Sequence, residues 1–186
     1  MKRILGFVVE RRPSTIADAG RGVFVAEGKV SRGAVASLYP GTLYEPDEPV
    51  LFPSIGNAFV LRCVDGLLVD GKDRGISRRI YLSCAARDRL GSHAACDTTW
   101  LTPHPRVPLA IGQYVNNQPK DRLANVVYQE VDLSADFPSH LMKYVPNVFN
   151  SPDTASKRPV RLVALLALRD INTEEELFST YFTEVH

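Results

Sequence analysis

Short runs of β-branched and aromatic residues recur along the chain, separated by turn-forming residues. They cover 4–10, 22–26, 34–39, 58–64, 125–133 and 160–168. Runs of this length bounded by Gly, Pro, Asn or Asp predict β-strands. Helical periodicity is weak, and it favours only short helices over 85–90 and around 139–144. The pattern therefore predicts a mainly β fold.

The segment between about 45 and 108 differs in character from its surroundings. Prolines punctuate both of its ends, at Pro46, Pro49, Pro53, Pro103, Pro105 and Pro108, and proline interrupts a strand ladder. Within it, Asp65-Gly66 and Asp70-Gly71 flank a short apolar run, which predicts a hairpin that 77–84 continue. For 186 residues we expect one domain over 1–186, with this segment as an insert at about 45–108.

The charge balance excludes two classes of partner. The chain has 22 Lys and Arg against 21 Asp and Glu, for a formal net charge of +1. Bulk binding to nucleic acid or to a membrane surface needs a larger excess of positive charge. The apolar run over 162–168 is also far shorter than a membrane span. We expect neither direct nucleic-acid binding nor a membrane segment.

Cysteine usage points to a reducing compartment. Three cysteines, Cys63, Cys84 and Cys96, cannot all pair, and no Asn-x-Ser/Thr acceptor occurs. The apolar run near the start is too short for a signal peptide. His93 and His104 lie near Cys96, but their spacing matches no zinc site. We expect a nuclear or cytoplasmic protein that is not secreted and binds no metal.

Three groups of residues carry candidate chemistry. Gly20-Arg21-Gly22 precedes a strand, and glycines flanking one residue let the backbone approach a ligand. The second group, 111–119, contains adjacent asparagines whose amides could bind a polar ligand, and the third, 161–181, is an apolar strand, a turn, an acidic patch and a tyrosine. Taken singly, each fits a turn or a solvated hairpin.

Taken in order, the three groups resemble the signature of the SET domain superfamily of protein-lysine methyltransferases. That signature reads Gly-x-Gly, then Asn-His-Ser, then Ala-x-Arg-Asp-Ile and Gly-Glu-Glu-Leu-x-x-x-Tyr. The matching blocks are 20–22, 114–118 with Asn125, and 167–171 followed by 175–181. The resemblance implies a SET-domain (β-clip-like) fold of small sheets, with a C-terminal pseudoknot and few short helices. An unrelated all-β domain would have to match all three blocks by chance.

The resemblance also implies a reaction. It makes S-adenosylmethionine the cofactor and a lysine side chain of a protein, histone or non-histone, the acceptor of its methyl group. Tyr181 matches the tyrosine at the methyl-transfer channel. Because the pKa of tyrosine is about 10, we assign it to orienting the amine rather than to removing a proton. The positions that match cofactor contacts are Gly20, Arg21, Gly22, Tyr114, Asn116 and Asn117.

Some family positions differ here. Asn117 stands in place of histidine, Gln118-Pro119 in place of Ser-Cys, and Glu174 in place of glycine. Ser179 stands where many relatives have Phe or Tyr, and no Cys-x-Cys segment follows Tyr181, so we expect another group to complete the wall of the lysine channel. Two functions stay open: a protein-lysine N-methyltransferase, which the spacing of Tyr181 favours, and a catalytically inactive SET-fold binding module.

Overall fold

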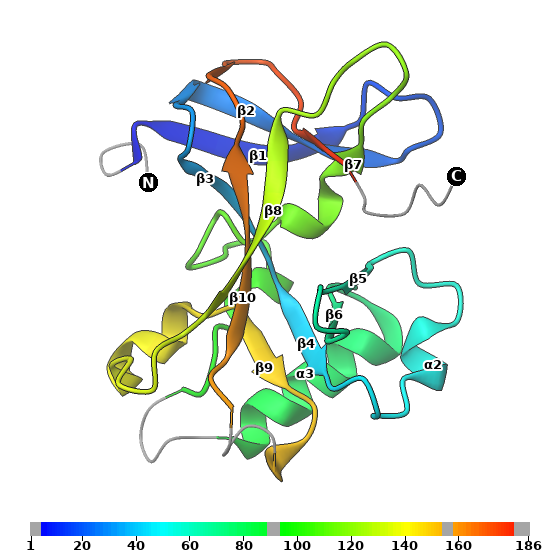
Figure 1. Cartoon of the computed structure of the whole chain (residues 1–186), viewed down its shortest axis with the longest axis vertical. Coiled ribbons are helices and arrows are strands. Elements are labelled where there is room, and N and C mark those ends of the chain that lie inside the picture. Colours follow the sequence, from blue (N-terminus) through cyan, green and yellow to red (C-terminus); the bar gives the residue numbers. More distant parts are fainter. Residues whose placement is uncertain (1–4, 89–93, 154–157, 181–186) are drawn as a thin grey trace.

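The computed structural model describes residues 5–88, 94–153 and 158–180, and strands dominate them (Figure 1). The strands are β1 (Phe7–Pro13), β2 (Arg21–Val30), β3 (Val35–Tyr39), β4 (Gly41–Tyr44), β5 (Val60–Arg62), β6 (Leu68–Asp70), β7 (Asn116–Asn117), β8 (Val126–Asp132), β9 (Asn147–Phe149), β10 (Arg161–Ala167), β11 (Ile171–Asn172) and β12 (Phe178–Ser179). The helices are α2 (Leu51–Ser54), α3 (Gly75–Arg87) and the short 3-10 helices η1 (Thr99–Leu101), η2 (Gly112–Tyr114) and η3 (Ser139–Tyr144). The predicted mainly β fold of small sheets with few short helices is confirmed.

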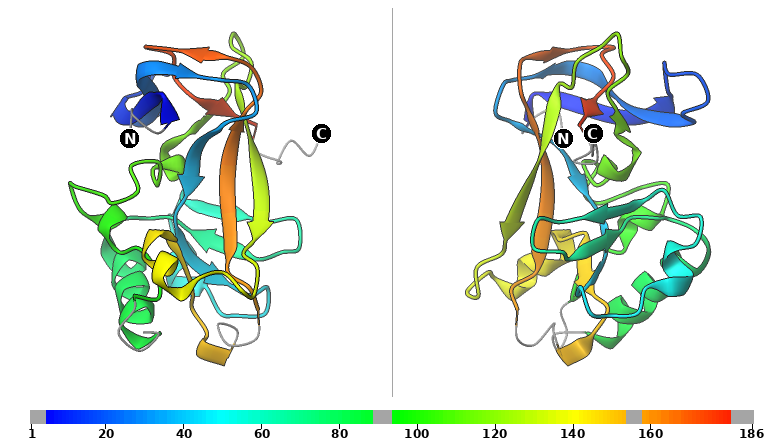
Figure 2. Two further views of the ribbon diagram at one scale, coloured as in Figure 1. Left: turned by 90° about the vertical axis from the view of Figure 1, so that its left-hand side faces the viewer. Right: turned by 45° about the vertical axis from the view of Figure 1, so that its right-hand side comes forward.

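The sheet β3-β10-β8 runs the length of the molecule (Figures 1 and 2). Its central strand, β10, pairs antiparallel with both neighbours. The sequence of β10 is almost continuously apolar, as expected for a strand covered on both faces, and most of its residues are buried. This sheet therefore joins the two ends of the molecule.

Each end of this sheet meets a different group of strands (Figure 1). The sheet β1-β2-β11 and the pair β7-β12 lie at one end, and the sheet β5-β6-β4-β9 lies at the other, beside α3. One large apolar cluster includes residues from both ends, among them Val25, Leu43 and Leu165. The two ends thus share a core.

The insert contains the predicted hairpin, which follows α2 and consists of β5 and β6. The amide of Gly66 donates to the Cys63 carbonyl (3.0 Å) in the turn between β5 and β6, where Gly66 has a φ of +89° that favours glycine. Strand β6 pairs with β4, so the hairpin extends the sheet at that end. The boundaries 1–186 for the domain and about 45–108 for the insert stay predictions.

The prediction that 77–84 continue the hairpin is wrong, because these residues belong to α3. The separate helix predicted over 85–90 is the last part of α3 over 85–87; Asp88 follows the helix, and 89 and 90 lie outside the described residues. Ser77, Tyr81 and Cys84 form the buried face, at the i, i+4 and i+7 spacing of a helix. Two of the three are small, weakly hydrophobic residues, so the hydrophobic pattern did not reveal the helix.

Arg161 fixes the insert to the core sheet through ion pairs. This arginine is only 8% exposed. Its guanidinium donates to Asp132 (2.6 Å) and Glu130 on β8, and to Asp65 in the hairpin turn (3.1 Å). The Arg158 guanidinium also donates a hydrogen bond to Asp65 (3.1 Å). A buried guanidinium with several carboxylate partners is well compensated, and it links three segments of the chain.

The pKa of Asp65 reflects this network. Burial acts to raise its pKa, but the Leu67 amide and the guanidinium groups of Arg161 and Arg158 outweigh burial and hold the pKa below its usual range. Asp65 therefore contributes stability above its unfolded pKa of about 3.9, and that contribution is lost as the pH falls through the lower folded pKa.

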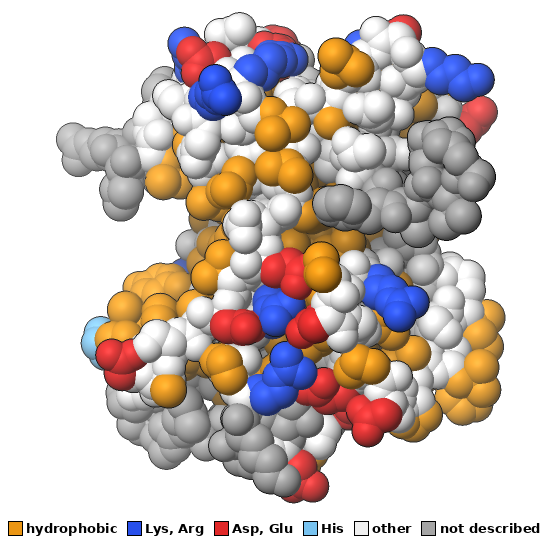
Figure 3. All heavy atoms as spheres, viewed as in Figure 1, with side chains coloured by type: hydrophobic (Ala, Val, Ile, Leu, Met, Phe, Trp, Pro, Cys, Tyr) orange, Lys and Arg blue, Asp and Glu red, His pale blue; other side chains and the backbone are white. Residues whose placement is uncertain are grey.

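Positive and negative side chains are intermixed on the face that Figure 3 shows.

Among the described residues, no helix combines the length and the apolar character that a membrane span requires.

We predict that Arg161→Met lowers the free energy of unfolding by about 1–3 kcal/mol at pH 7, because three carboxylates lose their common partner. The loss should shrink as the pH falls below about 4 and through the lowered folded pKa of Asp65. Urea unfolding at several pH values measures both effects. Lys29→Met is a matched control, because Lys29 pairs with Asp170 where both side chains are 52% exposed. It should change little, and an equal loss in both variants would contradict the prediction.

Candidate functional site

A cavity of about 460 Å³ lies beside the turn between β1 and β2. Its wall consists of Arg11 at the end of β1, residues 19–21 of that turn, residues 58–59 and 73–74 of the insert, and residues 113, 114 and 116. Small-molecule sites usually have volumes of roughly 300–1,000 Å³. The cavity is therefore large enough for a cofactor.

The cavity gathers most of the residues assigned to the cofactor from the sequence. Four of those six lie on its wall, namely Gly20, Arg21, Tyr114 and Asn116. Gly22 is not on the wall, and Asn117 belongs to β7, where it is paired with Ser179. Tyr181 lies outside the described residues. Two blocks nearly a hundred residues apart in the sequence thus form one site.

The two glycines of the Gly-x-Gly block have different roles. Gly20 has a φ of +71°, a left-handed conformation that glycine adopts without strain. Gly22 makes room for another residue of the protein, because a Cβ at this position would lie only 2.8 Å from Cδ of Glu176. The sequence explained both glycines by a bound ligand, whereas the structure shows that Gly22 accommodates a buried carboxylate.

Glu176 binds the turn that follows β1. Its carboxylate is almost fully buried, at 5% exposure for the residue. It accepts hydrogen bonds from the Ser14 hydroxyl (2.7 Å) and from the Thr15 amide (2.8 Å) and hydroxyl (2.5 Å). A carboxylate with several donors is well solvated by the protein itself. Glu176 therefore fixes the turn that supplies Gly20 and Arg21 to the cavity.

Asn116 completes this arrangement from the opposite side. Its side-chain amide nitrogen lies 3.1 Å from the Ser14 hydroxyl, 3.2 Å from the Arg21 carbonyl and 3.3 Å from Glu176 Oε1. The amide hydrogens of Asn116 are thus directed at the protein. Asn116 positions the wall of the cavity as well as forming part of it.

The closing segment of the chain pairs with the asparagine block. Strands β7 and β12 are parallel, and the Gln118 amide donates to the Ser179 carbonyl (2.8 Å). The buried side chain of Asn125 donates to the Glu176 carbonyl (2.8 Å) and accepts from the Phe178 amide (2.8 Å). These bonds hold Glu176 in place at the cavity.

Sequence reasoning missed a charged group on the wall. The Tyr114 hydroxyl donates to Asp73 (2.6 Å), and Arg11 donates to the same carboxylate oxygen (3.2 Å). The Arg11 guanidinium also lies over the Tyr114 ring, 4.4 Å from its centroid. Burial, and then the bond to Asp73, raises the pKa of Tyr114 to about 12, so its hydroxyl stays protonated. Arg11 and Asp73 are 62 residues apart, and no motif connects them.

Gln113 is a buried residue of the cavity wall. It is 7% exposed, and its buried Oε1 has no hydrogen-bond partner within the described part of the chain. An unpaired buried acceptor is costly. Gly71 lies beside it, where a Cβ would come 2.9 Å from Gln113 Cβ and 2.8 Å from the Tyr39 ring. Only glycine leaves this space open.

A chain of hydrogen bonds holds Phe59 on the cavity wall. The Phe59 carbonyl accepts from the Gly71 amide (2.8 Å) and from the Tyr39 hydroxyl (2.9 Å). Its amide donates to Asn57 (3.0 Å), which donates in turn to the buried carboxylate of Asp70 (2.8 Å). The buried aspartate thus shapes the part of the cavity that the insert supplies.

Tyr128 lies next to the small residue of the closing segment. Ser179 is fully buried, and its hydroxyl is 3.3 Å from the Tyr128 hydroxyl on β8. The Tyr128 ring meets the Tyr39 ring edge-on, with the centroids 6.3 Å apart. An aromatic side chain from another strand therefore borders position 179.

Two curated proteins are similar to nearly the whole chain. SET domain-containing protein 9 of Homo sapiens is 55% identical over 183 residues, which are 98% of this chain and 60% of that protein. The protein of the same name from Pongo abelii is also 55% identical over 183 residues, or 98% of this chain and 66% of that protein. This chain belongs to the SET-domain family. It spans less than two thirds of either relative.

Likenesses to solved structures are weaker. A chain of Polycomb Repressive Complex 2 from Chaetomium thermophilum, in an autoinhibited conformation bound to S-adenosylmethionine, has a TM-score of 0.49 and 16% identity. The likeness covers 95% of this SET domain and 15% of that chain. A TM-score of this size carries no conclusion of its own. No protein-family model matches the sequence.

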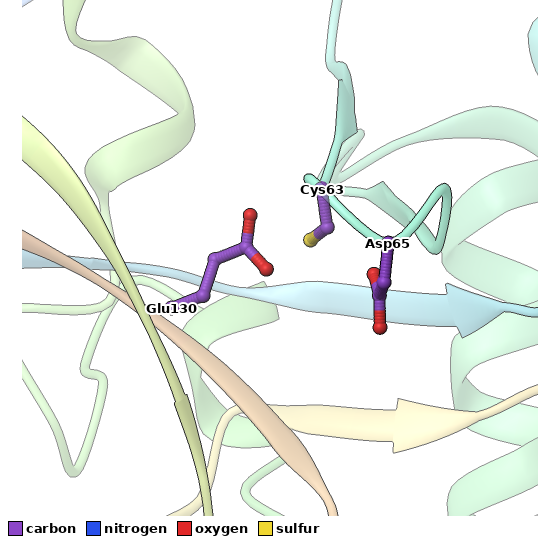
Figure 4. A group of neighbouring side chains, drawn as sticks. All are labelled: Cys63, Asp65 and Glu130. Atoms are coloured by element: carbon purple, nitrogen blue, oxygen red, sulfur yellow. The ribbon is translucent and has the colours of Figure 1, made fainter.

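One group of possible metal ligands lies away from the cavity of this SET domain. Cys63 and Asp65 from the hairpin turn and Glu130 from β8 place ligand atoms within 4.8 Å of one another (Figure 4). Burial, and then the charge of Glu130, raises the pKa of Cys63 to about 12, so the thiol is protonated at neutral pH. Zinc binds the thiolate, and Arg161 already pairs with both carboxylates. That the SET domain binds no metal stays a prediction.

We predict strong coupling between positions 22 and 176. Gly22→Ala should be destabilising, because its methyl group overlaps the Glu176 carboxylate, and Glu176→Ala should cost about 1–3 kcal/mol by leaving its donors unpaired. The double variant should be more stable than the sum of the two losses predicts, since the clash disappears with the carboxylate. Urea unfolding of all four proteins gives the coupling energy. Simple additivity would show that the two side chains do not compete for space.

Proposed function

We propose that this SET domain binds S-adenosylmethionine in the cavity and transfers its methyl group to a lysine side chain of a protein. The observation that carries the proposal is the convergence of Gly20, Arg21, Tyr114 and Asn116 on one cavity of suitable size. These positions were assigned from family motifs alone. The names of the curated relatives state no reaction. The activity, the substrate and the partners are therefore proposed here.

The groups on the wall fit the proposed cofactor. Its amino-acid end carries a carboxylate and an ammonium group, and Arg74 and Asp73 supply opposite charges side by side. The rings of Phe59 and Tyr114, 5.4 Å apart, offer apolar surface to the base. When bound, S-adenosylmethionine supplies a methyl group already attached to a sulfonium leaving group.

The protein's own task is then to align a neutral amine and exclude water. A lysine side chain has a pKa near 10.4, so it must lose a proton before it can attack, and burial in a channel favours the neutral form. Tyr181 orients that amine through its hydroxyl. Tyr128 fills the space that the small Ser179 leaves and so limits how many methyl groups the amine can carry.

The departures from the family motif are compatible with this proposal. Asn117 is held by backbone pairing to Ser179 in β7-β12, a role that does not require histidine. The parallel pairing of an internal segment with the closing segment supports the pseudoknot that the resemblance implies. The alternative function, a SET-fold module that binds without turnover, predicts the same cavity and differs only in the transfer step. The proposed compartment is nuclear or cytoplasmic.

We predict that S-adenosylmethionine binds the purified protein and that Asn116→Ala weakens binding. The variant removes the amide that holds Arg21 and Ser14 in place, for an expected loss of roughly 0.5–3 kcal/mol. Titration calorimetry measures both affinities. Asn150→Ala is the control, because Asn150 bonds to Glu48, and neither residue lines the cavity. Equal affinities for the two variants would remove Asn116 from the site.

We predict that Tyr181→Phe abolishes methyl transfer while leaving cofactor affinity and folding nearly unchanged. Phenylalanine keeps the ring and removes the hydroxyl that contacts the amine, so the loss should appear in turnover rather than in binding. The measurement is single-turnover transfer of labelled methyl groups onto a protein array, at equal cofactor occupancy. Cofactor binding without transfer in the wild type would favour the binding module.

Tyr128→Phe is the matched comparison, because it also removes one tyrosine hydroxyl. Transfer should continue, and the space released beside Ser179 should allow more methyl groups per lysine. Mass spectrometry of the product counts them. If Tyr128→Phe is inactive and Tyr181→Phe is active, the prediction is wrong, and Tyr128 rather than Tyr181 orients the amine.

A further inference from the structure

The turn between β1 and β2 carries two hydroxyl groups that both bind one buried carboxylate. The turn runs from Ser14 to Gly20 and is closed by a bond from the Ser14 amide to the Gly20 carbonyl (2.9 Å). Both the Ser14 and the Thr15 hydroxyl donate to Glu176. Thr15 is exposed and Ser14 is half-buried, so the turn lies at the surface while its contacts reach inward. The same turn supplies Ala19 and Gly20 to the cavity wall.

Arginines precede and contact this turn. Arg11 and Arg12 lie three and two residues before Ser14, in β1, which is an edge strand of its sheet. Arg11 pairs with Asp73, and Arg12 pairs with two glutamates. Arg122 donates to the Thr15 hydroxyl (2.5 Å), and its buried Nε lies 3.7 Å from Asp121. A guanidinium that already contacts the hydroxyl can pair with an anionic group placed there.

We propose that the Ser14–Thr15 turn is a phosphorylation site for an arginine-directed protein kinase and that the modification opens the cavity wall. Kinases of this class select substrates by charge pattern, and two arginines before a hydroxyl residue match an acidic substrate groove. The hydroxyl oxygen attacks the γ-phosphorus of ATP, and a new oxygen–phosphorus bond forms. The bond to the bridging oxygen breaks, ADP leaves, and the hydroxyl proton passes to the kinase's catalytic carboxylate.

The phosphate reverses the sign of the contact with Glu176. A hydroxyl donates a hydrogen bond to that carboxylate, whereas a phosphate carries about −1.5 to −2 charges at pH 7 and accepts bonds. A phosphate on either hydroxyl faces the Glu176 carboxylate, whose residue is only 5% exposed, and the two anions repel each other. Arg122, which donates to the Thr15 hydroxyl, can pair with the phosphate. The turn therefore leaves Glu176, and Gly20 and Arg21 leave the cavity wall with it.

The experiment uses the intact chain, an arginine-directed kinase and magnesium ATP. We expect one phosphate per chain, mapped by mass spectrometry to Ser14 or Thr15. The modified protein should unfold several degrees lower than the unmodified one and bind S-adenosylmethionine about tenfold more weakly. Phosphatase treatment should reverse both changes. The double variant Ser14→Ala/Thr15→Val, which keeps the size of both side chains roughly constant, should take up no phosphate.

The two readouts separate this inference from the proposed function, on which its cofactor part rests. If the unmodified protein does not bind S-adenosylmethionine, the proposed function fails, while a reversible fall in the unfolding temperature still supports release of the turn. No incorporation, incorporation elsewhere, or an unchanged unfolding temperature in the modified protein would each overturn the inference.

Discussion

The buried carboxylate of Glu176 is the contact on which the site depends. It comes from the closing segment, and it binds a turn more than 160 residues earlier in the chain. A carboxylate removed from water must find donors, and here the turn after β1 supplies them. That requirement determines the shape of the turn, the absence of a side chain at Gly22, and the position of Asn116. The part of the cavity wall that this turn supplies is a consequence of satisfying one charge.

The sequence identified the parts that are local and periodic. Runs of β-branched and aromatic residues predicted β2, β3, β8 and β10 to within a few residues. This succeeded because strand propensity and turn residues act over short distances. The first ten residues of α3 were missed, because the buried face consists of Ser77, Tyr81 and Cys84, whose mixed polarity hides the helical period. Local pattern is informative only where the buried face is strongly hydrophobic.

The site was accessible to sequence reasoning only where motifs recur in a family. Resemblance led to Gly20, Arg21, Tyr114 and Asn116, yet it gave no indication of Arg11 or Asp73, which lie on the same wall. Arg11 lies in β1 and Asp73 in the insert, so only the tertiary fold brings them together. No motif or spacing in the sequence predicts that pair. Gly22, which the motif assigned to the cofactor, is absent from the cavity wall and instead makes room for Glu176. Motifs point to positions, and contacts explain them.

The parallel pair β7-β12 has a consequence for the order in which the protein is made. Residues 116–117 are synthesised some sixty residues before the segment 178–179 that pairs with them. Pairing between segments so far apart is slow, because the intervening loop must close first. A nascent chain can therefore form the β1-β2 hairpin and the insert before residues 176–179 leave the ribosome. Until then the turn after β1 lacks the carboxylate that fixes it, so the part of the cavity wall that this turn supplies is completed by a late step of folding.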